Sequence, residues 1–405
     1  MSGGPPTWAP ASVGAAPRFG DATSDDLTSG KAWALLLASL ERAGTRMAGA
    51  PVHERASGYR HLLTLAALGI DEALRSGEGG EPRIRPGNVD NVLKWGMDCP
   101  DAAYSGTSLR GDTSYRIRGV RGTVRYVGLQ VMGGMETLAN VVVDDLEIAE
   151  DGSFDIVLSA DEHDGNWLRL DERASTLIVR QFFYDWENEL PAQLTIERTD
   201  GPEPGGHRSP DAEGTARHLV ALGEFIEASV AFWDDIEKVG RAEGLNRFRD
   251  PANRTDIGGA EENVTVWGSY DIGPDDALVV TVTPPPALYW SLVLGDEWWA
   301  SVDYANHQSS LNGHQAVLDS DGAFRAVVSI RDPGVANWLD PAGCTHGPMI
   351  VRWLRAERTP VPVTTVVPFD ELDSVLPADT RRVSAAERRT MIARRRAGVA
   401  RRFPR

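Results

Sequence analysis

The side chains best suited to chemistry gather in residues 295–307, which read Gly-Asp-Glu-Trp-Trp-Ala-Ser-Val-Asp-Tyr-Ala-Asn-His. This segment combines carboxylates and an imidazole with three aromatic rings. Flat rings pack on the faces of a cyclic ligand, while carboxylates and imidazole hydrogen-bond its hydroxyl groups. The mixture indicates a site for a sugar-like or cyclic, hydroxylated small molecule.

Within this segment we expect Asp303 and His307 to form a catalytic pair, general base and partner, with Glu297 as a second carboxylate. Two carboxylates astride a glycosidic bond would give hydrolysis, whereas one base beside a tyrosine would give elimination or isomerisation. The competing interpretation is that Trp298 and Trp299 anchor a loop in the core while the acids are solvated. Adjacent residues of a strand point to opposite faces, so only one of these two rings would share a pocket with the catalytic groups.

Further residues are expected to contact the ligand. They are Trp298, Trp299, Tyr304, Asn306, Trp95, Tyr104 and Arg352. Trp95 and Tyr104, together with Asp98, precede or begin the first predicted sheet and would line a cleft between two repeated units. A second aromatic and acidic patch, residues 182–189, is expected to cover the end of a sheet rather than to bind ligand.

Several familiar motifs are absent from the sequence. It has no Gly-rich loop for nucleotide phosphates, no His-Glu-x-x-His for zinc and no Gly-x-Ser-x-Gly for a serine hydrolase. The eight histidines are scattered without metal-ligand spacing, and Cys99 and Cys344 lie far apart. We therefore predict neither a metal site nor a cofactor.

Two stretches of the chain repeat each other. Residues 151–159 read Asp-Gly-Ser-Phe-Asp-Ile-Val-Leu-Ser, and residues 321–329 read Asp-Gly-Ala-Phe-Arg-Ala-Val-Val-Ser. Each is followed by Asn-Trp-Leu and then by Ile-Val-Arg, which ends at Arg180 in the first copy and at Arg352 in the second. Such a repeat indicates a duplicated unit with one architecture. We interpret the shared Asp-Gly, Asn-Trp and Arg positions as mainly structural, although the arginines could also pair with acidic loops or face a ligand.

The elements that would position these residues are mainly strands. Short β-type runs separated by Asp-Gly and similar turn signals are typical of an antiparallel sandwich or jelly roll. In the first copy they occupy residues 114–120, 123–131, 153–159 and 174–183. The predicted fold class is therefore mainly β with accessory helices, built on two repeated jelly-roll or sandwich-like units.

Helical periodicity appears outside the two copies. Residues 31–43 and a run around His61 predict two helices, and a third, carrying Leu222, Ile226 and Trp233, is expected to pack on a sheet. Ser384-Ala-Ala-Glu387 reads as a capping box that opens an arginine-rich helix. The expected organisation is a flexible start and helical segment (1–88), the first unit (89–200), a linker and helix (201–260), the second unit (261–370) and a basic C-terminal helix or tail (371–405).

The second copy resembles the family of domains of unknown function numbered 1214, which often accompanies family 1254 in bacterial proteins. The residues that carry the resemblance are Tyr289-Trp-Ser-Leu-Val-Leu294, Asn306, Ser309, Ser310, Asp321-Gly, Asp332-Pro-Gly and Asn337-Trp-Leu339. The match is weaker over the first copy. It implies a sandwich-like fold similar to that of carbohydrate-binding proteins, without a settled activity. This chain departs from the family pattern at Asp340, where proline usually follows Asn-Trp-Leu.

Composition limits the partners. The chain has 405 residues and a net charge of -18, which opposes the phosphate attraction that nucleic-acid binding requires and disfavours anionic membranes. No apolar run approaches the roughly 20 residues of a membrane span, and no secretory signal begins the sequence. We expect a cytoplasmic protein whose C-terminal arginines dock on its own acidic body or on a partner subunit, which would give a homo-oligomer.

Two hypotheses about function remain open. The first is a cofactor-independent enzyme, a hydrolase, lyase or isomerase, that acts on a sugar-like or cyclic hydroxylated small molecule. The second is a non-catalytic ligand-binding or scaffold protein with a lectin-like sandwich. The acid, base and aromatic mixture of residues 297–307 favours the first, whereas the duplication and the lack of a catalytic signature favour the second.

Overall fold

The computed structural model describes residues 23–28, 30–75, 82–87, 89–200 and 211–403. It is mainly β, with four sheets and accessory helices, which confirms the predicted fold class. The chain forms two compact units. A helical unit comprises the described parts of Met1–Glu81, Val92–Gly96 and Pro202–Glu243, and a β unit comprises those of Pro82–Asn91, Met97–Gly201 and Gly244–Arg405. The start that we predicted to be flexible lies outside the described residues, as do residues 201–210 of the predicted linker.

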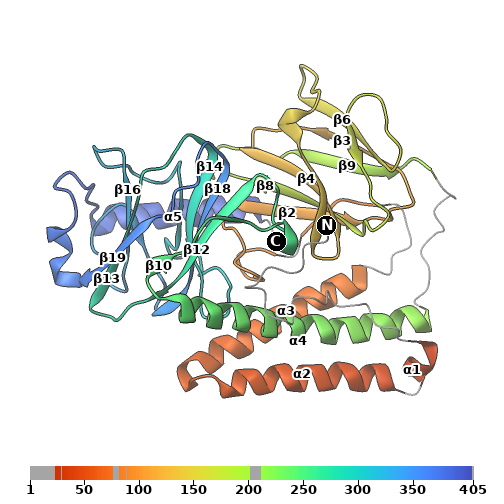
Figure 1. Cartoon of the computed structure of the whole chain (residues 1–405), viewed down its shortest axis with the longest axis horizontal. Coiled ribbons are helices and arrows are strands. Elements are labelled where there is room, and N and C mark those ends of the chain that lie inside the picture. Colours follow the sequence, from red (N-terminus) through yellow and green to blue (C-terminus); the bar gives the residue numbers. More distant parts are fainter. Residues whose placement is uncertain (1–22, 29, 76–81, 88, 201–210, 404–405) are drawn as a thin grey trace. The chain divides into compact units, whose positions relative to one another are not determined.

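The helical unit consists of α1 (Ser24–Thr28), α2 (Lys31–Gly49), α3 (Val52–Arg75) and α4 (Ala212–Glu243), all labelled in Figure 1. Leu36 on α2 and Ile226 on α4 are buried, as their helical spacing predicts. Arg42 on α2 forms a salt bridge with Glu227 on α4, with a distance of 2.7 Å between Nη2 and Oε2. The helix α4 was expected to pack on a sheet. That prediction was wrong within this unit, because α4 packs along α2 and α3.

The β unit begins with a first copy of eight strands, preceded by the short strand β1 (Arg85–Pro86). The eight are β2 (Ala102–Ser108), β3 (Tyr115–Val120), β4 (Tyr126–Gly133), β5 (Glu136–Val142), β6 (Ser153–Ser159), β7 (Trp167–Arg169), β8 (Thr176–Phe182) and β9 (Gln193–Arg198). They form one sheet in the order β1-β2-β8-β4-β5 and another in the order β7-β6-β3-β9.

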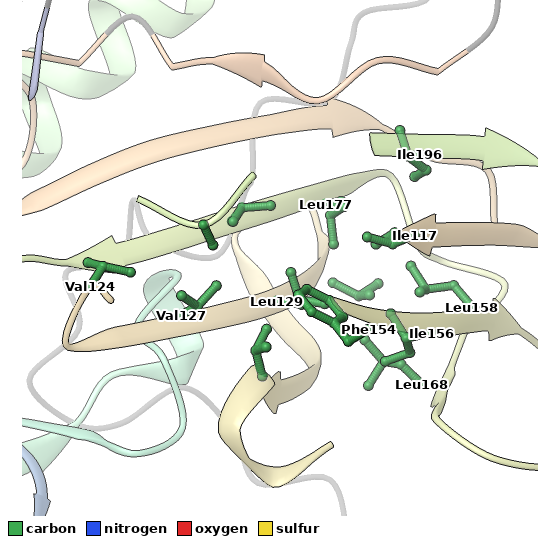
Figure 2. Packing of buried hydrophobic residues seen from close by; sticks show 14 of the residues in the cluster. Ile117, Val124, Val127, Leu129, Phe154, Ile156, Leu158, Leu168, Leu177 and Ile196 are labelled. Carbon is green, nitrogen blue, oxygen red and sulfur yellow. The ribbon is translucent and has the colours of Figure 1, made fainter. Parts of the chain in front are cut away.

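The two sheets of the first copy enclose a hydrophobic core. Leu129 and Leu177 extend from the first sheet, and Ile117, Phe154 and Ile156 from the second, into the same space (Figure 2). Alternate residues of each strand point inward, which is the period of two that an antiparallel sandwich requires. The first copy is therefore a sandwich.

The second copy repeats this arrangement strand by strand. Its strands are β12 (Asn263–Asp271), β13 (Asp276–Val282), β14 (Ala287–Leu294), β15 (Ser310–Asn312), β16 (Phe324–Val328), β17 (Trp338–Leu339), β18 (His346–Ala356) and β19 (Val363–Pro368). They form sheets in the orders β10-β12-β18-β14-β15 and β17-β16-β13-β19, with β10 (Arg247–Phe248) and β11 (Ala252–Asn253) beside β12. Strands β2 to β9 thus correspond one to one with β12 to β19.

The shared sequence motifs have the same structural role in both copies. Asn166 bonds the backbone of Glu147 and Asp155, and Asn337 bonds that of Val317 and Arg325, so that each asparagine ties a loop to its sheet. Trp167 and Trp338 each donate their indole N–H to the carbonyl group at the end of the neighbouring strand, at Ser159 and Ser329. The structural interpretation of the Asn-Trp motif is confirmed.

Among the described residues, the short 3₁₀ helices η2 (Val143–Asp145) and η3 (Thr255–Ile257) connect strands. The 3₁₀ helix η4 (Phe369–Ser374) follows the last strand, β19, and the C-terminal helix α5 (Ala385–Arg402) comes after it. Ser384 and Glu387 form the predicted capping box at its start. Arg388 bonds Asp332, and Arg395 bonds Tyr304 and Ser310. The expectation that the basic tail docks on the protein's own body is therefore confirmed.

Candidate functional site

The two sandwiches contact each other through one outer sheet face from each copy. In the first copy, Ala102, Tyr126 and Phe182 form a row across β2, β8 and β4. They pack in one buried cluster with Tyr289 and Leu354, which are neighbours on β14 and β18. Tyr126 and Tyr289 occupy the same position in their copies, as do Phe182 and Leu354. The contact is therefore self-complementary, like the isologous interface of a twofold symmetric dimer.

Polar contacts across this interface are reciprocal. Tyr289 of the second copy donates its hydroxyl hydrogen to Asp101, with 2.6 Å between Oη and Oδ2, and Asp101 directly precedes β2. Tyr126 of the first copy bonds Glu262 at 3.4 Å, and Glu262 directly precedes β12. Each copy thus contributes one tyrosine and one acidic residue, and each carboxylate accepts a hydrogen bond from the tyrosine of the other copy.

An asparagine completes each of these contacts. Asn312 on β15 donates to Asp101 at 2.7 Å, and Asn140 on β5 donates to Glu262 at 2.9 Å. Trp186 also donates its indole N–H to Asp101 at 2.7 Å. Asp101 is fully buried and accepts three hydrogen bonds, so its charge is compensated by donors in place rather than by solvent.

The paired arginines of the repeat lie next to this apolar row, on the same faces. Arg180 on β8 lies between Tyr104 on β2 and Gly128 on β4. Arg352 on β18 lies between Thr265 on β12 and Ser291 on β14. Residues opposite one another in a sheet point to the same side. We use the name inter-sheet layer for these two arginine rows together with the apolar row of Ala102, Tyr126, Phe182, Tyr289 and Leu354 beside them.

Each arginine reaches across the interface to the same place in the other copy. Arg352 donates from Nη2 to the carbonyl oxygen of Met97, and Arg180 donates from Nη2 to that of Gly258. Met97 stands five residues before β2, and Gly258 stands five residues before β12. Both acceptor residues have left-handed backbones, with φ of 54° and 84°. The duplication therefore extends to the loops that hold the arginines.

Arg352 is buried and Arg180 is half-buried, yet both lack a charged partner in the part of the chain that the structure describes. Neither Arg180 nor Arg352 forms an ion pair with a carboxylate of the described residues. Burial lowers the pKa of Arg180, and the nearby Arg352 lowers that pKa further. Burial also raises the pKa of Tyr104, whose ring lies 5.7 Å from the Arg180 guanidinium. By accessible surface, Tyr104 and Arg180 are both half-buried.

Several buried polar atoms on the two facing sheets have no hydrogen-bond partner. Arg352 is only 7% exposed, and its Nη1 has no partner. Ser291 Oγ beside it and Arg180 Nε in the other copy also have no hydrogen-bond partner. Gln130 Oε1 belongs to the same set. No hydrogen bond among the described residues satisfies these donors and acceptors.

The residues predicted to be catalytic do not meet as a pair. The Asp303 carboxylate accepts hydrogen bonds from Asn306 and from the backbone N–H of Ala305, and so holds the turn that contains it. The His307 ring bonds Asp340 instead, with 2.7 Å between Nδ1 and Oδ2. Asp340 is the residue at which the chain departs from the family pattern. Glu297 is half-buried and lies in the loop before this turn.

The predicted ligand contacts do not form one site but lie in several separate places. Tyr104 and Arg352 come together in the inter-sheet layer. Trp299 is buried against Trp267 at a ring distance of 5.1 Å, and Tyr304 is buried in the core cluster of the first sandwich. Trp298 is half-buried beside Asp296, Asn306 accepts from Arg396, and Trp95 belongs to the helical unit, where it packs on Trp233.

Sequence reasoning missed Asp101, Tyr126, Tyr289 and Glu262 as members of one site. It noted Arg180 but assigned it to the architecture. The repeat contained the signal, because Arg180 and Arg352 end the same Ile-Val-Arg motif. The part of the chain that the structure describes contains no group of three or more His, Cys, Asp and Glu side chains that could hold a metal ion.

The chain is similar to proteins of known structure. An uncharacterised protein from Burkholderia cenocepacia shares 32% sequence identity, with a TM-score of 0.79 over 86% of this chain and 99% of the other. The VPA0106 protein from Vibrio parahaemolyticus shares 14% identity, with a TM-score of 0.44 over 76% of this chain and 98% of the other. No curated protein sequence matches the chain.

A family model matches residues 275–357, which run from the start of β13 through β18 in the second sandwich. Its description is "Protein of unknown function (DUF1214)". The similarity of the first copy to family 1254 stays a prediction. The matched residues and the Burkholderia relative, which is aligned over nearly its whole length, together show that the chain belongs to the DUF1214 family.

Proposed function

We propose that this protein binds a small, polar, ring-containing molecule in the inter-sheet layer. One observation supports the proposal above others: Arg352 is buried with an unpartnered nitrogen, and Ser291 Oγ and Arg180 Nε add unpartnered atoms from both copies. A buried polar group without a partner costs about 1–3 kcal/mol. A ligand that bonds several of these groups would recover that free energy. This is the ligand-binding alternative of the sequence analysis, placed at a different site.

The apolar row beside the arginines supports a ring-containing ligand. Tyr126, Phe182 and Tyr289 pack together there, with ring distances of 5.5 Å and 5.0 Å from Phe182 to the two tyrosines. Tyr104 adds an aromatic face beside Arg180. Binding sites for small molecules commonly combine aromatic walls with a few placed polar groups.

Blocking the layer tests this proposal. Ser291→Leu and Thr265→Leu place a larger apolar side chain on either side of Arg352. Thr281→Leu is the control, because Thr281 is half-buried on β13 in the other sheet. Small molecules released from the denatured full chain are identified by mass spectrometry. Thermal shift is then measured with glucose, myo-inositol, glucuronate and 2-hydroxybenzoate.

The expected result is a saturable rise in Tm for the native chain and for Thr281→Leu, and its loss in the two blocked variants. Circular dichroism checks that the blocked variants fold. The proposal is overturned if no small molecule co-purifies and no member of the panel raises Tm. It is also overturned if binding is unchanged in both Ser291→Leu and Thr265→Leu.

A second candidate is the cofactor-independent acid–base enzyme, a hydrolase, lyase or isomerase. Its support is the pair of His307 and Asp340, since a carboxylate that holds Nδ1 leaves Nε2 to take up or give a proton. Hydrolysis of chromogenic glycosides would measure hydrolase activity, and deuterium exchange into a bound cyclic ligand would measure the proton abstraction of a lyase or isomerase. His307→Ala and Asp340→Asn should abolish the signal. Asp303→Asn should retain it, because the Asp303 carboxylate accepts hydrogen bonds from Ala305 and Asn306 within its own turn. Equal signal in His307→Ala and the native chain would remove this candidate.

The expected setting belongs to the same proposals: a cytoplasmic protein with a small-molecule partner that also forms a homo-oligomer through α5. None of the helices that the structure describes has both the length and the apolar character needed to cross a membrane. Arg389 and Arg394 are exposed on α5, where they could meet another molecule of the chain. Light scattering of the native chain and of an Arg389→Glu, Arg394→Glu variant measures the mass. An oligomer only in the native chain is the expected result.

A further inference from the structure

The inter-sheet layer has approximate twofold symmetry in its chemistry as well as in its backbone. Tyr126 and Glu262 repeat the relation of Tyr289 and Asp101 with the roles of the copies exchanged. The contact of Arg180 with the Gly258 carbonyl repeats that of Arg352 with Met97. Two equivalent guanidinium groups therefore meet one interface from opposite copies.

These two groups bring positive charge into a buried layer. Asp101 and Glu262 are occupied by tyrosine and asparagine donors from the facing copy. Neither arginine has a carboxylate partner among the described residues. A buried charge is costly unless it is paired and hydrogen-bonded. A guanidinium matches the geometry of a carboxylate, which can accept two parallel hydrogen bonds from it.

We propose that the ligand of the inter-sheet layer carries two negative charges, one bound by Arg180 of the first copy and the other by Arg352 of the second. This inference rests on the proposed function and names the class of ligand, a dicarboxylate built on a ring. A ligand with one charge would leave one guanidinium without a carboxylate partner. A ligand with two negative charges would pair with both arginines, and its ring would then bridge the two sandwiches.

A series of similar ligands tests the inference. Phthalate, isophthalate and terephthalate carry two carboxylates at three spacings, benzoate carries one, and dimethyl phthalate carries none. Calorimetric titration of the full chain at constant ionic strength measures the affinity for each, and for inorganic phosphate. We expect at least one dicarboxylate to bind about 30-fold or more tightly than benzoate, the effect of one buried charge pair.

Substitution of the arginines separates the two contacts. Arg180→Gln and Arg352→Gln should each lower the affinity for the preferred dicarboxylate by a similar factor, about 30-fold or more. The dicarboxylate should then bind no more tightly than benzoate. Arg173→Gln is the control, because Arg173 is an exposed residue of the first copy that pairs with Asp171 and Glu136. If Arg352→Gln does not fold, Arg352→Lys replaces it in the test, because lysine keeps the positive charge but lacks the planar guanidinium with its paired N–H donors. An intermediate affinity is then expected.

Several results would overturn the inference. One is equal affinity for benzoate and all three dicarboxylates in the native chain, which requires no variant. A second is dicarboxylate binding that survives both arginine substitutions. A third is phosphate binding with the same dependence on both arginines, since both would then converge on one anionic group. If dimethyl phthalate or a neutral sugar binds and Ser291→Leu blocks it, the proposed function stands while this inference fails.

Discussion

The hydroxyl group of Tyr289, on strand β14 of the second sandwich, donates a hydrogen bond of 2.6 Å to Asp101, the residue directly before strand β2 of the first. Tyr126 and Glu262 make the same contact in the opposite direction. Such reciprocity is expected when two copies of one unit first met as equivalent partners and then remained joined in one chain. The contact fixes how the arginine rows face each other, and it can be tested separately from any ligand.

Tyr289→Phe should destabilise the protein by about 1–3 kcal/mol, because Asp101 is fully buried and would lose one of its three donors. Tyr126→Phe should cost less, since its bond is 3.4 Å long and Glu262 is only half-buried. Urea unfolding of both variants measures the difference. An equal loss in the two variants would contradict this account.

Arg395→Met should destabilise the protein by about 2 kcal/mol or more. The Arg395 guanidinium is buried, bonds the backbone of Tyr304 and Ser310, and lies 4.7 Å from the centre of the Trp186 ring. Arg394→Met is the matched control on the same helix. Its side chain is 69% exposed and lies 3.9 Å from Glu187, so the expected change is below about 0.5 kcal/mol. Thermal unfolding of the two variants should differ clearly, and similar Tm values would show that α5 is not held by Arg395.

The stability of the helical unit should depend on pH through His61. Burial lowers the pKa of His61 to about 4 in the folded chain, from 6.5 in the unfolded chain. Above pH 6.5 the ring is neutral in both states, so it has no effect. As the pH falls from 6.5 to 4, the unfolded state takes up the proton first, and folding loses up to about 3 kcal/mol.

The His61→Phe variant has no such group and keeps a ring of similar size. The free energy of unfolding of the native chain should therefore fall relative to that of the variant between pH 7 and pH 4. Urea unfolding at both pH values, followed by the helical signal in far-ultraviolet circular dichroism, measures it, because α2, α3 and α4 of this unit contribute most of that signal. Parallel pH curves for the two proteins would show that burial of His61 does not control the effect.

Gly322 should be intolerant of a side chain for reasons of backbone conformation alone. Its φ is 78°, and an added Cβ would meet nothing within 4 Å. Gly322→Ala should therefore cost about 1 kcal/mol. Gly44→Ala is the control, because Gly44 lies inside α2 with equally open space, and there alanine should stabilise the helix by about 0.5–1 kcal/mol. Chemical denaturation should therefore show a lower free energy of unfolding for Gly322→Ala and a higher one for Gly44→Ala. A change of the same sign in both would contradict the interpretation that the Asp-Gly turn needs glycine for its positive φ.

Much of the fold could be predicted from the sequence, because its signals are local. The strand at residues 153–159 was predicted with the bounds that β6 has, from alternating apolar residues after an Asp-Gly turn. The capping box at Ser384 needs only residues three apart, and it opens α5 as expected. The packing of α4 was predicted wrongly, because an apolar stripe shows that a helix is covered but not by which element.

The candidate site was harder to predict for the same physical reason. Asp303 and His307 are four residues apart in sequence, yet the turn directs the Asp303 carboxylate to Asn306, while His307 bonds Asp340. The segment combined the right residue types, but the hydrogen bonds within the turn determine where each side chain points. Spacing along a loop does not fix that geometry.

The sequence by itself determined that the protein is a duplicated, mainly β molecule whose copies share turns, loop anchors and an arginine in the same strand. Periodicity and turn chemistry act over a few residues, so they can be read directly. Only the tertiary structure decided that Arg180 and Arg352 share one buried layer and that Tyr289 bonds Asp101. Those contacts join residues far apart in the chain, and they depend on which faces of the two sandwiches pack together, which no local signal specifies.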